Sequence, residues 1–311
     1  MSTWTDIVDF LDQKTPQESR KWLGEQLQDS LVRISTLYEG ANVIYYSSAF
    51  LQRPYTECQI MPDDINGFMT TVHQMDTKKG LVLLLHTPGG VVTAVETIVD
   101  YLHKKFKRIV AIIPVYAMSG GTMIALASNR IVMGKQSQLG PIDPQMPFQN
   151  KTVSARAVIN GFSRAEADIE KNAKLAHLWA PILQTMGPSL LEEAREALSY
   201  SEHLVKTWLR QRMLKNENVD AEEVAKKFNA MGDDMFVHGQ RISIDNVKKW
   251  GLVVEEMEAS QEKQDAILTA YHLATVIFES TTTIKIICNH KGKRWVSHSI
   301  VQSTHPGGTV E

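Results

Sequence analysis

The stretch of sequence that decides the fold reads LVLLLHTPGG (Leu81–Gly90), RIVAIIPVYAMSGGTMIALAS (Arg108–Ser128) and LGPIDPQ (Leu139–Gln145). Its first apolar run, Leu81–Leu85, ends in a Pro-Gly-Gly turn, which is typical of a buried parallel strand. Apolar residues then recur at helical spacing over residues 91–106, and a second apolar run, Ile109–Val115, follows. The pattern predicts a strand, a helix and a second parallel strand, which together form one right-handed crossover.

The second strand is followed by a serine among small residues, Ser119, at the start of a helix predicted over residues 120–128. Because parallel strands end at the same edge of a sheet, the Gly89-Gly90 turn and the Ser119-Gly120 turn should face each other there. Backbone N–H groups at the start of a helix can hold a negatively charged oxygen. A serine nucleophile beside the amides of Gly90 and Gly120 is the minimum that acyl transfer requires. Glycine-rich turns also occur for packing alone, so Ser119 by itself is a weak signal.

Composition bounds the class of protein. The chain has 311 residues, 43% hydrophobic and 22% charged, which describes an ordinary globular protein with a large core. A net charge of −2 favours neither nucleic acid nor an anionic membrane as a partner. The two cysteines, Cys58 and Cys288, have no metal-ligand spacing and are too few for a disulfide framework. Gly90 is followed by two valines, whereas a nucleotide-binding P-loop needs a lysine after its glycines. We therefore expect no metal, nucleotide or other cofactor.

The amino-terminal residues MSTWTDIVDFLDQ carry acids where a signal peptide has a basic segment followed by an apolar one. No apolar run approaches the 18 residues or so that a membrane span needs. The sequence therefore predicts a cytoplasmic protein without a membrane anchor.

Several motifs together resemble one family of peptidases. A Pro-Gly-Gly turn, about thirty residues and then Ser-Gly-Gly before a helix is similar to the Clp protease proteolytic subunit and to signal peptide peptidase A, both with the crotonase-like fold. The stronger resemblance is to the serine dehydrogenase proteinase family. It rests on these segments: His86–Gly90, Ala117–Ala127, Leu139–Gln145, Val237–Glu258 and Gln264–Ile287. The resemblance covers roughly residues 35–295.

The resemblance implies a fold, an activity and partners. The expected fold is α/β and crotonase-like (Clp protease-like), with a repeated β-β-α core and added helices. The expected activity is that of a serine endopeptidase acting on a peptide or protein substrate, with no cofactor, no nucleic acid and no membrane involved. Helices after the core pack between subunits in crotonase-like enzymes, so a homo-oligomer is expected.

The same reading divides the chain into four parts. Residues 1–34 are expected to form a helical extension outside the core. The peptidase core should comprise residues 35–150 and 232–300. Between them, residues 151–231 should form a helical insertion that offers an oligomer surface, and residues 301–311 a loose tail.

The residue that activates the serine stays open at this stage. The Clp-type triad places a histidine in the loop after the next strand, but here that loop supplies Asp143 and no histidine. The resemblance to signal peptide peptidase A points instead to a lysine some 40–55 residues beyond the serine. That window holds Lys171 and Lys174, and Lys174 is favoured because its neighbours are apolar and a lysine base must be desolvated. A solvated helix face is the plainer role for either lysine.

Two histidines are the other candidates for the base. His238 lies where the family commonly has Ser-His-Gly, and it would act as the base or orient the base. His86 directly precedes the oxyanion turn, where it could also pack the strand end. Asp143 could orient a histidine or a lysine, or cap a loop.

The predicted site therefore has Ser119 as nucleophile, with Lys174, His238 and Asp143 as its catalytic partners. Gly90 and Gly120 form the oxyanion hole, and Gly89 and His86 contribute to substrate binding. Two rival functions remain. An acyl-CoA enzyme of the same fold would keep the oxyanion hole and use carboxylates as acid and base. A non-catalytic oligomeric scaffold, a degenerate peptidase, would need no base at all.

Overall fold

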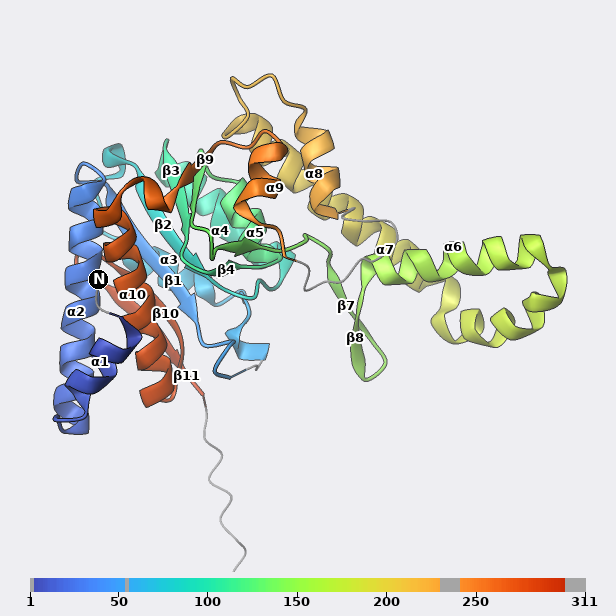
Figure 1. The fold of residues 1–311 in the computed structure, drawn as a ribbon. Helices are drawn as coiled ribbons and strands as arrows, with labels where there is room; N and C mark the ends of the chain where they lie inside the picture. The colour runs from blue at the N-terminus through green and yellow to red at the C-terminus, as the bar shows by residue number, and fades with distance from the viewer. Residues whose placement is uncertain (1–2, 54–55, 230–240, 300–311) are drawn as a thin grey trace, which may run out of the picture.

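The computed structural model describes residues 3–53, 56–229 and 241–299. A seven-stranded sheet lies between two layers of helices, with the strand order β11-β10-β1-β2-β3-β5-β9 (Figure 1). The strands of this sheet are β1 (Asn42–Ser48), β2 (Leu81–His86), β3 (Ile109–Ile113), β5 (Arg130–Met133), β9 (Val254–Glu256), β10 (Thr283–Asn289) and β11 (Arg294–His298). The five neighbouring strands β1, β2, β3, β5 and β9 run parallel to one another. Strand β10 pairs antiparallel with β1, and β11 pairs antiparallel with β10. The α/β fold class predicted from the sequence is confirmed.

The crossover predicted from the opening stretch is present. Strand β2 pairs in parallel with β3, with Leu81 opposite Ile109, and helix α4 (Val92–Lys105) connects them. Every residue of β2 and β3 is buried. Helices cover both faces of the parallel strands, so each strand reads as a continuous apolar run rather than as an alternating one.

Two core strands, β3 and β5, are each followed by a second short strand. After β3 comes β4 (Tyr116–Ala117) and then α5 (Gly120–Leu126), and after β5 comes β6 (Gln138–Leu139). These short strands form a second layer of pairs: Thr87 with Ala117, β4 with β6, and Leu139 with Ile242. This is the repeated strand–strand–helix core expected from the resemblance. The second strands place Thr87, Ala117 and Leu139 beside one another at the carboxyl edge of the sheet.

The helices of the two covering layers come from different parts of the chain. One face of the sheet packs against α3 (Asp64–Val72), α4, α5, the last turns of α7 (Ala176–Gln211), α8 (Ala221–Asn229) and α9 (Ile244–Lys249). The other face packs against α1 (Trp4–Leu11), α2 (Pro16–Leu37) and α10 (Gln261–Ser280). Figure 1 shows α2 and α10 side by side on that face.

The amino-terminal helices are therefore part of the core, and the expectation that residues 1–34 lie outside it was wrong. Leu23, Leu31 and Ile34 of α2 are each 1% exposed and pack into the cluster that also holds residues of β1 and α10. Helix α2 begins with Pro16, preceded by a capping box in which Thr15 and Glu18 bond each other's backbone amides. The apolar stripe that the sequence showed is the face that covers the sheet.

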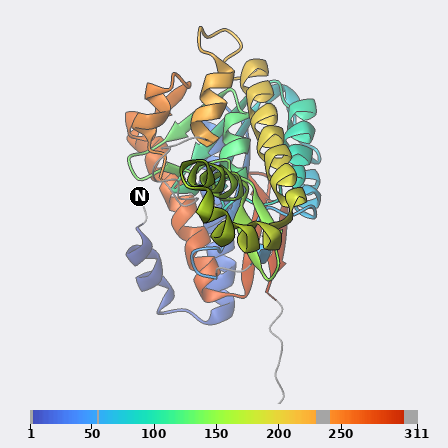
Figure 2. The ribbon, with the colours of Figure 1, turned by 90° about the vertical axis from the view of Figure 1, so that its right-hand side faces the viewer.

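A long arm projects from this core (Figures 1 and 2). It consists of α6 (Ala155–Lys171) and the first half of α7, with a hairpin of β7 (Gln145–Phe148) and β8 (Lys151–Ser154) at its base. Residues 135–150, although they hold three prolines, contribute two short strands, β6 and β7. Helix α7 bends at Gly187, whose φ is 71°. None of the helices in the described ranges has the length and apolarity that crossing a membrane demands.

Candidate active site

Two turns meet at the carboxyl edge of the sheet, as the sequence predicted. The backbone N–H of Thr87 donates to the carbonyl of Tyr116 at 3.0 Å, and the N–H of Met118 donates to the carbonyl of Thr87 at 3.0 Å. These two bonds hold the residues that follow β2 against those that follow β4. The Gly89-Gly90 turn and the Ser119-Gly120 turn therefore lie side by side.

Ser119 adopts a strained backbone conformation. Its φ of 46° and ψ of −112° are unusual for a residue with a side chain, and it stands immediately before α5. Strain of this kind costs of order 1–3 kcal/mol and persists where the surroundings impose it, often at a functional residue. A strained serine between a strand and a helix is also how hydrolases expose a nucleophilic hydroxyl. Ser119 is half-buried, and its side chain does not cap the helix that follows.

The amides of Gly90 and Gly120 lie close together beside this serine. A Cβ placed on Gly120 would lie 3.2 Å from the backbone nitrogen of Gly90. Gly120 is the first residue of α5, so its N–H has no partner inside the helix. Gly90 pairs with Ile60 as in a parallel ladder, where the bonds come from the residues on either side, Gly89 and Val91. Within the described ranges, neither the Gly90 N–H nor the Gly120 N–H is used in a hydrogen bond, so both can donate to an oxyanion.

Close packing explains why glycine stands at three of these positions. Gly89 has a φ of 91°, and a Cβ there would lie 2.5 Å from the carbonyl oxygen of Met118. A Cβ on Gly90 would lie 2.3 Å from the backbone of Ile60, and one on Gly121 would lie 2.5 Å from the side chain of Thr87. Real Cβ atoms do not approach so closely. The two turns can meet only because these side chains are absent.

Asp143 lies in the next loop along this edge. Gly140 in that loop contacts Met118, and its backbone N–H donates to the Thr122 hydroxyl of α5 at 3.0 Å. The buried Asp143 carboxylate accepts from the Arg156 backbone N–H at 3.0 Å and from the Gln145 side chain at 3.2 Å. Arg156 is in the first turn of α6, so Asp143 caps the helix on which the arm is built. The sequence left two roles open for Asp143, to orient a base or to cap a loop, and its place in catalysis stays a prediction.

His86 points into the face of the sheet that α10 covers. Its ring lies 5.0 Å from the rings of Phe50 and Tyr271 and 6.0 Å from that of Tyr116, measured between ring centres. The side chain is 2% exposed, and this burial lowers the pKa of His86 from its usual 6.5 to about 3. A group with so low a pKa is too weak a base to take a proton from a serine hydroxyl at neutral pH. His86 packs the strand end, the plainer of the two roles considered from the sequence.

The two candidate lysines lie on the arm. Lys171 ends α6, and Lys174 is in the short 3₁₀ turn Ala173–Leu175 that joins α6 to α7. Both side chains are exposed, and Figure 1 shows this turn at the outer end of the arm, away from α5. One chain alone therefore does not bring either lysine to Ser119.

His238 lies outside the described residues. The described residues nearest to it in sequence both contact the Asp143 loop. The Ile142 N–H donates to the Phe228 carbonyl at 3.2 Å, and Leu139 and Ile242 exchange two backbone bonds of 2.9 and 3.0 Å. Leu139 in turn pairs with Ala117, two residues before Ser119.

Sequence reasoning missed two residues that support the oxyanion turn. The Thr87 hydroxyl accepts from the Gly89 N–H at 3.2 Å, and Ile60 binds the backbone on both sides of Gly90. Thr87 could have been found, because it stands inside the quoted His-Thr-Pro-Gly-Gly motif. Ile60 lies in a segment without periodicity, and nothing in its sequence marks it.

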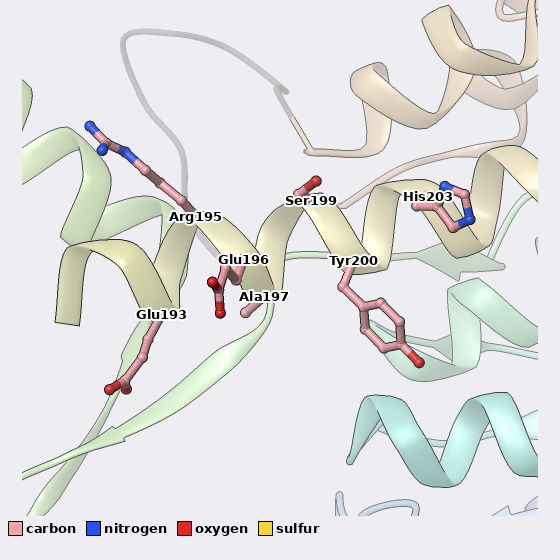
Figure 3. Close-up of a pocket in the computed structure, with 7 residues that line it drawn as sticks. All are labelled: Glu193, Arg195, Glu196, Ala197, Ser199, Tyr200 and His203. Carbon is pink, nitrogen blue, oxygen red and sulfur yellow. The ribbon is translucent and has the colours of Figure 1, made fainter. Parts of the chain in front are cut away.

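Two hollows in the surface lie away from these turns. One, of about 810 Å³, is lined by side chains between Glu193 and His203 of α7 (Figure 3). There the Tyr200 hydroxyl donates to the Glu96 carboxylate of α4. The other, of about 1230 Å³, lies between α2, the end of α10 and strands β10 and β11. Neither is lined by Ser119 or by the glycine turns.

A repeated strand–strand–helix core with a strained serine facing two backbone amides is the arrangement of ClpP-like serine peptidases. Residues 50–272, well over half of the chain, match the family of ClpP-like SDH-type serine proteinases, and the chain belongs to this family. The match includes both glycine turns and Ser119. The family resemblance read from the sequence is thereby confirmed.

Individual relatives are more distant. Two uncharacterized proteins of Methanocaldococcus jannaschii are similar to this chain. One is 27% identical over 194 residues, covering 62% of this chain and 59% of that protein. The other is 28% identical over 172 residues, covering 55% and 51%. The chain thus spans between half and three fifths of the length of these curated relatives.

Two solved structures of a membrane-bound stomatin-specific protease, 1510-N, also align with this chain. One is a serine-to-alanine mutant, with 17% identity over 63% of this chain and 75% of that one. The other is a lysine-to-alanine mutant in complex with a substrate peptide, with 18% identity over 63% and 71%. The TM-score is 0.39 for both.

Proposed function

We propose that this protein is a serine endopeptidase that cleaves peptide bonds through an acyl-enzyme on Ser119. The Ser119 Oγ attacks the carbonyl carbon of the scissile bond, and a general base takes the hydroxyl proton. The backbone N–H groups of Gly90 and Gly120 donate to the oxyanion of the tetrahedral intermediate. That intermediate collapses with loss of the amine, which receives the proton, and water then hydrolyses the ester.

The observation that carries this proposal is the meeting of the two turns. A residue under backbone strain is costly, and here it is a serine whose neighbours are two amides without other partners in the described ranges. Packing alone would explain the glycines. It would not explain why a serine, rather than another glycine, takes a φ of 46° next to them. Membership of a serine proteinase family supports the same reading.

For the general base we propose His238 or Lys174. Exposure of Lys174 counts against it in a single chain, because a lysine that acts as a base at neutral pH must be desolvated. His238 needs no such shift, since the ordinary pKa of a histidine already lies near neutrality. Asp143 would contribute indirectly, by fixing the loop beside Met118 and the start of α6.

We further propose that the protein acts on peptide or protein substrates in the cytoplasm as a homo-oligomer, and needs no cofactor. The arm supports self-association, because Leu178 is 66% exposed and Ile182 is 49% exposed on α7. Large apolar side chains at such exposure are commonly covered by a neighbouring subunit in symmetric assemblies. The cytoplasmic setting is supported by the two cysteines, Cys58 and Cys288, which are free and buried.

A fluorophosphonate probe tests the proposed function. It phosphonylates an activated serine, and peptide mapping by mass spectrometry should place the adduct on Ser119. Ser119→Ala should abolish labelling and lower peptide hydrolysis by about 10³-fold or more. It should change thermal stability little, since the position already holds a Cβ. The matched control is Ser199→Ala on the exposed part of α7, which should label like the parent protein.

The same experiment separates the rival functions. A parent protein that turns over acyl-CoA thioesters equally well with Ser119→Ala would be an acyl-CoA enzyme that uses only the oxyanion hole. A parent protein that is not labelled and hydrolyses neither peptides nor thioesters would be a scaffold. Either result would overturn the peptidase proposal.

A further inference from the structure

The oxyanion turn lies against a short segment, Gln59 to Met61, in which Ile60 forms an isolated parallel bridge with Gly90. The Ile60 N–H donates to the Gly89 carbonyl at 2.7 Å, and the Val91 N–H donates to the Ile60 carbonyl at 2.9 Å. The backbones approach so closely that no Cβ fits on Gly90. Because these bonds fix the peptides on both sides of Gly90, the position of Ile60 sets the direction of the Gly90 N–H.

Both ends of this short segment are held by one buried ion pair. The Lys285 ammonium of β10 donates to the Gln59 carbonyl at 3.0 Å, just before Ile60. The Asp64 carboxylate at the start of α3 accepts from the Met61 N–H at 3.0 Å, just after it. Lys285 and Asp64 also bond each other at 2.6 Å, with side-chain exposures of 5% and 0%. The pair therefore clamps the segment between them.

A third side chain joins this pair to the turn itself. The Tyr46 hydroxyl of β1 donates to the other Asp64 oxygen at 2.8 Å, and it lies close enough to the Thr87 side chain for Thr87 to affect its pKa. The Thr87 hydroxyl accepts from the Gly89 N–H. Burial, and then the charge of Asp64, raise the pKa of Tyr46 well above its usual value, so the phenol keeps its proton and remains a donor. The contacts run without a gap from Lys285 to the Gly89 amide.

A buried ion pair is a poor way to gain stability, because removing two charges from water offsets much of their attraction. Well-packed apolar residues would serve the core equally well at this point. Here each member of the pair makes a further bond to the backbone of the segment next to Gly90. Apolar residues could not make those bonds. That difference points to a role in holding backbone geometry.

We propose that the Lys285–Asp64 ion pair, together with Tyr46, positions the oxyanion hole by fixing the Gln59–Met61 segment against Gly90. These are positioning residues, and they touch neither the substrate nor Ser119. The proposal rests on the proposed function, since it assumes that the Gly90 N–H is an oxyanion donor. It also assigns a role to Lys285, which lies beyond residues 50–272 that match the family.

The test uses two variants and one control. The double variant Lys285→Met with Asp64→Asn removes both charges at once, so no single buried charge is left behind. Tyr46→Phe removes one hydroxyl and is the milder change. Leu273→Ala is the control, because it creates a cavity under α10 on the opposite face of the sheet and lowers stability without contacting the site.

The first measurement is the kinetics of fluorophosphonate labelling of Ser119, split into the reversible constant KI and the rate constant kinact. The phosphonyl oxygen must enter the oxyanion hole in the reaction, so kinact should fall about 10- to 100-fold in the double variant. Loss of a whole donor would cost about 100- to 1,000-fold. KI should stay within about twofold of the parent value, as expected when only transition-state binding is lost. Tyr46→Phe should lower kinact by a smaller factor, and Leu273→Ala should leave it unchanged.

The second measurement is amide hydrogen exchange over residues 59–61 and 87–91. It does not depend on activity, so it tests the clamp even if the parent protein is never labelled and the proposed function fails. Exchange at Ile60 and Val91 should speed up in the double variant and not in Leu273→Ala. Unchanged exchange in the folded double variant would overturn the proposal. So would a parental kinact, measured in Tyr46→Phe if the double variant does not fold.

Discussion

The edge of the sheet and the arm differ in how their residues are held. At the sheet edge, each glycine of the two turns is within contact of another backbone, and Ser119 is forced into a strained conformation. On the arm, Gly161 of α6 has no atom within 4 Å of where a side chain would start, and Leu178 is largely exposed. Residues at the edge of the sheet are therefore closely packed, whereas these residues of the arm are exposed to solvent.

This difference bears on the two groups that a serine peptidase needs beside its nucleophile, the oxyanion hole and the general base. An oxyanion hole consists of backbone amides, and it can be built wherever strands and turns are packed tightly enough. A general base is a side chain that must be brought to the serine with a suitable pKa. For the first, the core supplies the two amides that we propose as oxyanion donors, those of Gly90 and Gly120. For the second, the fold offers Lys174 on the open arm, or His238 outside the described residues.

The largest expected effect concerns the base, and it decides whether the arm takes part in the chemistry. Replacing the true base by alanine should slow labelling of Ser119 by about 10³-fold or more, as for a catalytic histidine. We expect this of His238→Ala, with a rate that rises through a pKa near 6.5–7 in the parent protein. If Lys174→Ala has the large effect instead, the rate should rise through a more alkaline pKa and the arm belongs to the active site. Parental rates in both variants would remove both candidates.

The next effect compares one glycine from each region. Gly90→Ala places a Cβ 2.3 Å from the Ile60 backbone, so the turn must shift and the oxyanion donor with it. We expect labelling to fall by about 100- to 1,000-fold, together with a lower melting temperature. Gly161→Ala should stabilise α6 by about 0.5–1 kcal/mol and leave labelling unchanged. If the two variants had the same melting temperature by calorimetry and the same labelling rate, the proposed difference in packing between the two regions would be contradicted.

A third effect tests whether the core near the site excludes water from the His86 side chain. Burial lowers the pKa of His86 to about 3, whereas the unfolded chain has a value near 6.5. Between these values the unfolded state binds one more proton, so stability falls as the pH drops below about 6.5, by up to about 1.4 kcal/mol per pH unit. His86→Phe keeps the ring contacts but has no group to protonate, so its stability should not fall in this way between pH 6.5 and pH 3. Urea unfolding at pH 7, 5.5 and 4.5 measures it, and a constant difference between the two proteins would show that His86 is hydrated.

The smallest effect on the folded subunit should come from the arm surface. Leu178→Ser with Ile182→Ser should change the stability of a subunit by no more than about 0.5 kcal/mol, because both side chains are exposed. The same change should break the proposed assembly. Light scattering should then report a mass near 35.0 kDa at micromolar concentration, against a multiple of it for the parent. A parent protein that is already monomeric would contradict the proposed oligomer.

Most of the fold could be predicted from short stretches of sequence. The runs Leu81–Leu85 and Ile109–Val115, which became β2 and β3, are apolar, and the spacing of α4 is helical, because local burial decides these elements. The position of α2 could not be predicted in this way. Its apolar stripe indicated a covered face, but only the packing of α2 against α10, over 200 residues later, shows which surface it covers.

The same distinction holds for the candidate site, where residues close in sequence could be predicted and residues brought together by tertiary packing could not. Ser119 and the two glycine turns follow two neighbouring parallel strands, β2 and β3, and they meet because such strands end at the same edge of the sheet. Lys174 was favoured by its distance in sequence from Ser119, but sequence spacing cannot show that α6 leads it outward. The Lys285–Asp64 pair joins residues 221 positions apart, and no pattern in the sequence connects them.

The antiparallel pairing of β1 with β10 determines when the central sheet can be completed during synthesis on the ribosome. Ile44 pairs with Asn289, so one edge of the central strand β1 has no partner until some 245 further residues have been made. At 5–20 residues per second this takes roughly 12–50 s, during which that edge is open to wrong pairing. Lys285 arrives on the same late strand. On its proposed role, the nascent chain carries its nucleophile long before the oxyanion hole is braced, and so remains a poor protease until β10 has been made and paired.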